Sequence, residues 1–285
     1  MYMPEILSYG FMQRAFIAGV MVALICPTIG IFIVLRRLSM IGDTLSHVAL
    51  AGVAAGMLGG IYPIYSALVF SILAAFGIEK LRKAYQDYAE LSIAIILSTG
   101  IGLATILISM GSGNAAIFSY LFGSIALVSS RDVLFVMILS IFILVSTILL
   151  YRGLFYITFD EEAAGLSGVP VKWLNHYFIV LIAVTIAVAM RIVGILLVSS
   201  LMVVPVATSL QLAKSFKSAW LYSMVFGLLA VLIGLTLSFY GDLAPGGTIV
   251  ISGVVILMVT IFLKSIIKKK EVSSSGMSIT NSLSK

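Results

Sequence analysis

Long apolar segments constrain this chain more than any other feature of its sequence. A helix needs about 20 residues to cross a bilayer core about 30 Å thick, and its backbone polar groups must bond within the segment. Nine segments reach about that length: 15–35, 42–60, 62–79, 91–110, 133–151, 173–190, 192–213, 218–240 and 247–267. The sequence therefore predicts an all-α polytopic membrane protein with nine transmembrane helices. Eight or ten spans are the alternatives.

The composition fits a chain that lies mostly in lipid. Hydrophobic residues make up 61% of it and charged residues 10%, whereas soluble domains have about half and about a quarter. The net charge of +6 does not indicate nucleic-acid binding, because the basic residues lie at the ends of the apolar segments. We therefore expect membrane lipid, and no nucleic acid, as the surroundings of this chain.

Lysine and arginine predict the orientation. Most of them fall at one set of segment ends, which the positive-inside rule assigns to the cytoplasm. They are Arg36, Arg37, Lys80, Arg82, Lys83, Arg152, Lys172, Lys214, Lys217, Lys264, Lys268, Lys269 and Lys270. Only Arg14, Arg131 and Arg191 fall on the other side. The N-terminus is therefore expected outside and the C-terminus inside a bacterial plasma or inner membrane.

Residues 91–130 carry no charge and are too long for a single crossing. Their second part, 112–130, is interrupted by Gly113, Asn114 and Gly123. We expect a short or re-entrant helix pair there, because irregular backbone at membrane depth must be buried in protein.

A single transmembrane domain is expected over residues 1–270. The Ser-rich stretch 271–285 is expected to be a disordered polar cytoplasmic tail. The sequence contains no G-x-x-x-x-G-K-[ST] phosphate loop, so ATP-driven transport would need an ATPase on another chain.

One predicted span contains two side chains that can ligate a metal. Asp43 and His47 are four residues apart and share one face of a helix. With a helix start near Leu38, they would lie ~8 Å and ~14 Å along its axis. A carboxylate oxygen and an imidazole nitrogen can hold a transition metal ion, and ionisable residues at this depth are usually functional. Ser46 could orient the imidazole.

Other interpretations of this pair stay open. Asp43 could cap the helix while His47 bonds a neighbouring carbonyl, or the two could relay protons in a secondary transporter. An intramembrane metalloprotease is disfavoured because the H-E-x-x-H pattern is absent. A purely structural scaffold would leave the pair unexplained.

Polar groups on three further segments could line a pathway or a gate. Ser199 and Ser200 precede Pro205, which frees a backbone carbonyl within a helix. Asn114 lies in the interrupted segment, and Asp242 lies between the last two spans, at the outer end. The alternatives are ordinary helix packing and a loop that starts a helix.

The loop 159–170 predicts a short cytoplasmic helix. It opens with acids suited to a helix N-terminus and closes with glycines and a proline suited to its end. These residues are Asp160, Glu161, Glu162, Gly165, Gly168 and Pro170. Such a helix could dock into a groove of a partner, and a solvated connector is the alternative.

Six segments together resemble one known family. They are Leu35–Arg37, Gly42–Leu50, Tyr120–Ser124, Asp160–Gly168, Val193–Thr208 and Asp242–Thr248. In order and spacing they are similar to the zinc/manganese/iron-type ABC transporter permeases, over roughly residues 11–265. The chain most resembles the zinc-uptake members. Manganese members typically carry a proline before the glycine after the His motif, and Ala49–Gly52 lacks it.

The resemblance implies a compact fold like that of type II ABC importers. It implies a homodimer, two cytoplasmic ATPase subunits that bind ATP, and an extracytoplasmic metal-binding protein. Asp43 and His47 match the family's intramembrane metal positions, and the loop 160–168 matches its ATPase coupling helix.

The expected function is a permease subunit for ATP-driven import of a divalent metal, Zn²⁺ first and Mn²⁺ second. Such a subunit is not itself an enzyme and has no catalytic residues and no permanently bound cofactor. We expect no further carboxylate or histidine clearly within a span. Water, backbone carbonyls, Asn114 or hydroxyls would therefore complete the metal shell.

Overall fold

The computed structural model describes residues 6, 8–85, 88–111, 114–124 and 128–283, with side chains except at 83, 89, 114–116 and 267–283. Helices build this part of the chain, and no strand occurs in it. The helices are α1 (Gly10–Leu35), α2 (Ser39–Leu58), α3 (Pro63–Ala84), α4 (Ala89–Met110), α5 (Asn114–Phe122), α6 (Ser130–Leu149), α7 (Tyr151–Phe159), α8 (Glu161–Leu166), α9 (Val171–Val193), the 3₁₀ turn η2 (Ile195–Leu197), α10 (Val198–Leu212), α11 (Phe216–Gly241) and α12 (Pro245–Leu283).

Nine helices of the described ranges are long and apolar enough to cross a membrane. They are α1, α2, α3, α4, α6, α9, α10 together with η2, α11 and α12. The prediction of nine spans is confirmed. The N-terminal bound differs most at α1, which begins at Gly10 instead of residue 15. Polar side chains such as Gln13 and Arg14 can extend from a helix end to the interface, so the helix outruns the purely apolar stretch.

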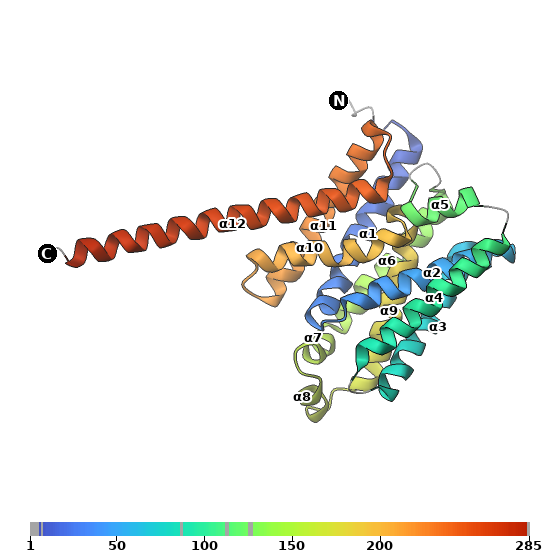
Figure 1. Ribbon diagram of the computed structural model, residues 1–285, viewed down its shortest axis with the longest axis horizontal. Coiled ribbons are helices and arrows are strands. Elements are labelled where there is room, and N and C mark those ends of the chain that lie inside the picture. Colours follow the sequence, from blue (N-terminus) through green and yellow to red (C-terminus); the bar gives the residue numbers. More distant parts are fainter. Residues whose placement is uncertain (1–5, 7, 86–87, 112–113, 125–127, 284–285) are drawn as a thin grey trace.

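The last helix also runs past the predicted end of the membrane domain. The backbone of α12 stays helical to Leu283, and this helix extends away from the bundle (Figure 1). The polar tail from Glu271 was predicted to be disordered, and its side chains lie outside the described ones. A polar helix without packing partners gains little stability from propensity alone, so the order of this tail stays a prediction.

The interrupted segment forms a helix too short to cross the bilayer. The nine residues of α5 span about 14 Å. The sequence predicted a short or re-entrant pair, and the described residues of 112–130 hold the one helix α5 before α6 begins at Ser130. Gly123 follows α5 with φ +77°, and a Cβ there would lie 2.1 Å from the carbonyl oxygen of Ile192. Only glycine fits this approach.

The core lies along α1, α2 and α9, whose side chains are mostly buried. The three helices α2, α3 and α4 pack together on one side, and α10, α11 and α12 pack on the other (Figure 1). The buried helix α9 lies between them and contacts α1, α3 and α6. The short helix α8 lies at the opposite end of the bundle from α5 (Figure 1). We call the α8 end the inner end, because it carries most of the basic residues.

Small residues hold α2 closely against two neighbours. A Cβ on Gly52 would lie 2.6 Å from the Cα of Ala67 in α3, and one on Gly100 of α4 would lie 2.6 Å from the side chain of Val48. Small residues at such positions let membrane helices approach closely. The helix that carries Asp43 and His47 is therefore fixed along its length by packing.

Candidate metal-binding site

The pair on α2 has the geometry of two ligands for one ion. The atoms Asp43 Oδ1 and His47 Nε2 lie 3.9 Å apart. Metal bonds to nitrogen or oxygen are about 2.0–2.2 Å long, so one ion can contact both atoms. The helix begins at Ser39, which places the two residues about 6 Å and about 12 Å along its axis. Both lie in the inner half of a bilayer core.

The capping interpretation of Asp43 is wrong. The N-cap of α2 is Leu38, and no side chain caps the helix there. Asp43 is the fifth residue of the helix, beyond the orphan N–H groups that a capping side chain satisfies. Its carboxylate therefore has no capping role at the start of α2.

This chain encloses the pair only in part. The side chain of His47 is 24% exposed and that of Asp43 is 39% exposed. The described residues contain no group of three or more His, Cys, Asp or Glu side chains that could hold a metal. Tight four-coordinate sites need more ligands than this. The pair can contribute half of such a shell.

One predicted pathway residue lies close to the pair. A Cβ on Gly42 would lie 3.4 Å from Ser199 Oγ and 3.7 Å from the sulfur of Met202, so α10 packs against α2 one residue before Asp43. Ser46 donates its hydroxyl to the carbonyl of Gly42 at 2.8 Å. Its proton is thus used within α2, and the orienting role that we predicted for it stays a prediction.

The other predicted pathway residues are placed as follows. Ser200 is partly buried on α10, and Pro205 is buried within the same continuous helix. Thr208 donates to the carbonyl of Val204 at 2.9 Å. The side chain of Asn114 lies outside the described residues. The pathway role of these groups stays a prediction.

Asp242 lies at the outer end, in the loop between α11 and α12, whereas the metal pair lies on α2. It is the C-cap of α11, with φ +50° in the left-handed region, and it is exposed. It lines a cavity of about 380 Å³ together with Gly123, Ser124 and Pro245. The chain therefore turns from α11 into α12 beside the segment that follows α5.

The predicted short cytoplasmic helix is α8. Asp160 caps it and accepts a hydrogen bond from the N–H of Ala163 at 2.9 Å. Gly168 follows its end with φ +81°. Leu166 is 92% exposed, so the helix presents an apolar side chain outward.

Sequence reasoning missed a partly buried polar cluster at the outer end. We call Tyr62, Tyr120, Asp132 and Arg191 the outer cluster. Asp132 accepts hydrogen bonds from Tyr62 and from the N–H and hydroxyl of Ser129, at 2.9 and 2.8 Å for the last two. Arg191 Nε lies 3.4 Å from Asp132 Oδ2, and its guanidinium lies 4.9 Å from the ring centre of Tyr120.

This cluster corrects one expectation. We expected no further carboxylate clearly within a span, but Asp132 lies in the first turn of α6 and is buried. Its oxygens are already engaged, so it is not a free metal ligand. Burial and the bond to Asp132 raise the pKa of Tyr62 to about 12, so this phenol stays a donor at neutral pH.

A second polar cluster lies at the inner end. We call Arg36, Arg82, Glu161 and Asn175 the inner cluster. Arg36 Nη2 lies 2.8 Å from Asn175 Oδ1 and 3.4 Å from Glu161 Oε2. Asn175 Nδ2 donates to Glu161 Oε1 at 2.7 Å, and Arg82 Nη2 lies 3.9 Å from Glu161 Oε2. Only Glu161 had been predicted as a functional residue. Its partners lie up to 125 residues away in sequence.

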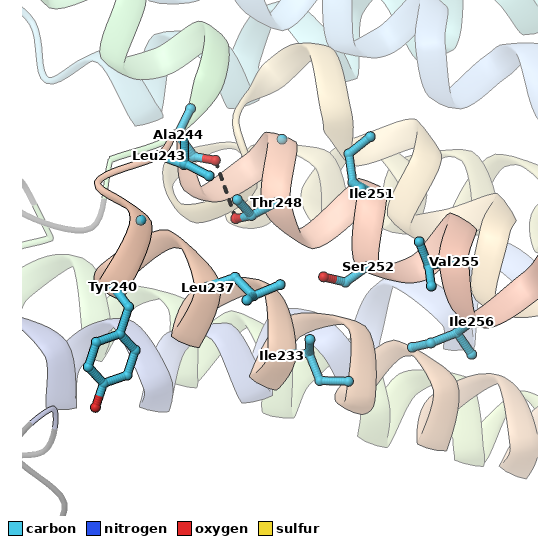
Figure 2. Close-up of a pocket in the computed structure, with 12 residues that line it drawn as sticks. Ile233, Leu237, Tyr240, Leu243, Ala244, Thr248, Ile251, Ser252, Val255 and Ile256 are labelled. Carbon is cyan, nitrogen blue, oxygen red and sulfur yellow. Dashed lines mark hydrogen bonds between the residues drawn. The ribbon is translucent and has the colours of Figure 1, made fainter.

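An apolar groove between α11 and α12 is a poor candidate for the ion. It has a volume of about 810 Å³, and Figure 2 shows Ile233 and Leu237 of α11 beside Ser252 and Ile256 of α12. The hydroxyl of Thr248 donates to the carbonyl of Pro245 at 2.9 Å. A groove with so few polar atoms suits an acyl chain or an apolar helix more than a cation.

Comparison with known proteins places this geometry in a family. The sequence matches the ABC 3 transport family over residues 8–264. The chain belongs to the ABC 3 transport family. It is thus a multi-pass membrane permease of a family of metal transporters.

Individual relatives match over nearly their whole length. A protein of Treponema pallidum (strain Nichols) described as "Probable metal transport system membrane protein" is 42% identical over 260 residues, which cover 91% of this permease and 98% of the relative. The "Manganese import system permease protein ScaB" of Streptococcus parasanguinis is 30% identical, over 90% of this permease and 91% of the relative.

A solved structure has the same fold. It is a chain of "PsaBC from Streptococcus pneumoniae in complex with Fab", with a TM-score of 0.83 and 29% sequence identity. The match covers 93% of this permease and 97% of that chain. The predicted fold class, a compact ABC metal permease, is confirmed.

Proposed function

We propose that this permease is the membrane subunit of an ATP-driven importer of a divalent transition metal, and that Asp43 and His47 bind the ion transiently. One observation carries the proposal. A carboxylate oxygen and an imidazole nitrogen lie 3.9 Å apart within a span of a chain that belongs to the ABC 3 transport family. Neither side chain caps an end of α2. Binding a cation would explain why two ionisable side chains are placed within a membrane span, where they are energetically unfavourable.

The sparse ligand set suits transport. A carrier must bind its ion strongly enough to take it up and weakly enough to release it. Two side chains of one chain leave the rest of the shell to water, to backbone carbonyls or to hydroxyls such as that of Ser199. A second copy of the permease could supply another Asp43 and His47. The partial exposure of both residues is consistent with the homodimer that we propose.

The energy would come from a separate ATPase subunit that binds ATP, because this chain has no phosphate loop. The segment around α8 would be the coupling loop, with Asp160 as its cap and Leu166 exposed to the partner. The remaining predicted residues of this loop are Glu161, Glu162, Gly165 and Gly168. An extracytoplasmic metal-binding protein would dock at the outer end, near the cavity beside Asp242.

We place Mn²⁺ first and Zn²⁺ second as the transported ion. The preference for zinc rested on the missing proline at Ala49–Gly52 alone. Manganese is named in the description of the Streptococcus parasanguinis relative, and a carboxylate with hydroxyl and carbonyl oxygens nearby suits Mn²⁺. The imidazole of His47 suits both ions.

The test is uptake of radioactive manganese and zinc by cells that lack their own copy of the permease and produce one variant each. Asp43→Ala and His47→Ala should abolish uptake while the permease remains in the membrane and still co-purifies with an ATPase. Glu90→Ala, which removes an exposed carboxylate from the first turn of α4, is the matched control. Normal uptake by well-produced Asp43→Ala would refute the site.

A proton-coupled secondary transporter is the second candidate, since Asp43 and His47 could also relay a proton. The two functions differ in their energy source. Uptake that stops when cellular ATP is depleted, with the proton gradient maintained, supports the ABC importer. Uptake that follows the proton gradient alone supports the secondary transporter.

A further inference from the structure

The inner cluster connects α8 directly to the turn that precedes the metal pair. Arg36, the residue after α1, donates to Glu161 of α8 and to Asn175 of α9. Asn175 in turn donates to Glu161. Three hydrogen bonds thus close a triangle between the α1–α2 turn, α8 and α9. A displacement of any one corner changes the bonds at the other two.

The triangle is buried on the bundle side and open on the α8 side. The side chain of Arg36 is 7% exposed and that of Glu161 is 41% exposed, while Asn175 is buried. Burial lowers the pKa of Arg36, and the charge of Glu161 opposes that shift. A buried cation depends strongly on its carboxylate partner, so Arg36 is expected to follow Glu161 when α8 moves.

The turn that Arg36 begins is stiff. Arg37 has φ +58°, in the left-handed region, and Leu38 donates its N–H to the carbonyl of Ile33 at 2.9 Å. The next residue, Ser39, starts α2. A turn closed by backbone bonds passes on a displacement instead of absorbing it. Asp43 follows in the second turn of the same helix.

Glu161 also has a second arginine and space beside it. Arg82 of α3 lies 3.9 Å from the oxygen that Arg36 contacts. A cavity of about 220 Å³ is lined by Arg36, Arg82, Glu161, Leu38 and residues 157–159. A carboxylate between an arginine of α3 and one of the α1–α2 turn, with free volume next to it, can shift from one to the other.

We propose that Glu161, Arg36 and Asn175 are positioning residues that transmit the motion of α8 to Asp43 and His47. This proposal rests on the proposed function, because it assumes that α8 meets the ATPase and that the α2 pair meets the ion. Glu161 faces the bundle while Leu166 on the same short helix faces outward. The helix α8 thus offers Glu161 to the membrane bundle and Leu166 to the proposed ATPase.

The experiment uses the assembled complex of permease, ATPase and binding protein in lipid vesicles. Metal uptake and ATP hydrolysis are measured together, with Mn²⁺ as the ion. Glu161→Gln should lower the amount of Mn²⁺ imported per ATP hydrolysed by about tenfold while hydrolysis continues, which is the size of a typical coupling energy between sites. Glu90→Gln removes an equal charge from an exposed position in the first turn of α4, away from α8, and should leave the ratio unchanged.

A double exchange tests the pairing itself. Arg36→Glu should uncouple the complex, and combining it with Glu161→Arg should restore part of the ratio, because the two charges again attract each other. The unfolding temperature of each variant is measured in the same membranes.

Two outcomes would overturn the proposal. One is an import ratio in Glu161→Gln equal to that in Glu90→Gln. The other is a parallel fall of import, hydrolysis and unfolding temperature in Glu161→Gln. Asp43→Ala keeps the two proposals apart. If Asp43→Ala imports Mn²⁺ normally, the proposed site fails, whereas a normal ratio in Glu161→Gln alone refutes only the transmission.

Discussion

The two ends of the bundle hold their charges in different ways. At the outer end, Asp132 is fully buried, accepts hydrogen bonds from Tyr62 and Ser129 and forms an ion pair with Arg191. At the inner end, Glu161 is 41% exposed, lies 3.4 and 3.9 Å from two arginines and borders a cavity. The carboxylate of the outer cluster is thus buried, whereas the carboxylate of the inner cluster is partly exposed beside a cavity.

The difference indicates which end can rearrange. Breaking a buried ion pair costs several kcal/mol, whereas an exposed pair contributes about 0–1 kcal/mol. The outer cluster therefore fixes α3, α6 and α9 relative to one another, and the inner cluster permits small displacements. The ATPase that we propose would act at this same end.

Two glycines with similar backbone angles test this contrast most strongly. Gly194 has φ +88°, and a Cβ there would lie 2.4 Å from the carbonyl oxygen of Leu121. Gly168 has φ +81° and no atom within 4 Å of such a Cβ. Gly194→Ala should lose more than about 4 kcal/mol of stability, and Gly168→Ala about 1–2 kcal/mol. Thermal unfolding in detergent measures both, and equal losses would contradict a tighter outer end.

Removing the buried carboxylate is the next largest change. Asp132→Ala should destabilise the protein by about 3 kcal/mol, because Arg191 loses this buried counter-charge and Tyr62 its acceptor. Asp242→Ala changes an exposed carboxylate at the same end and is the control. Unfolding of purified protein by heat should separate the two variants clearly. A similar unfolding temperature for both would mean that the outer cluster is less closed than its geometry indicates.

The hydroxyl of Tyr62 gives a smaller effect that depends on pH. Tyr62→Phe removes a bond to a charged acceptor and should cost about 1.5–3 kcal/mol at neutral pH. The folded protein raises the pKa of this phenol from 10.0 to about 12. The contribution is therefore complete below pH 10 and is lost as the pH rises toward 12. The unfolding temperature of wild type should exceed that of Tyr62→Phe just below pH 10. The difference between the two should become small close to pH 12.

The smallest effect is expected at the inner end. Glu161→Gln should change the free energy of unfolding by only about 1 kcal/mol, because the amide oxygen can still accept from the buried Arg36, which also keeps its bond to Asn175. The change should shrink further in high salt. Unfolding measured at low and high ionic strength checks this. A loss as large as that of Asp132→Ala would remove the contrast between the two ends.

Much of the fold follows from local sequence. The nine spans follow from apolar length, since a bilayer leaves few alternatives for such segments. Asp160 and Gly168 sit where a short helix must begin and end, and α8 lies between them. The shared face of Asp43 and His47 follows from helix geometry alone.

The remaining features depend on contacts between distant segments. Tyr62 and Asp132 are 70 residues apart, and no local pattern links them. The closeness of Ser199 to Gly42 follows from packing of α10 on α2. The start of α2 at Ser39 has no capping side chain to signal it, so the sequence could not exclude Asp43 as a cap.

The two clusters also share one helix. Asn175 and Arg191 both lie on α9, about 24 Å apart along its axis. Asn175 bonds to α8 near the inner end of α9, and Arg191 pairs with Asp132 near its outer end. A stiff helix held at its outer end tilts when its inner end is displaced, and points nearer the outer end move less. A displacement of Glu161 would therefore fade with depth along α9, so the inner half of the bundle would move more than the outer half.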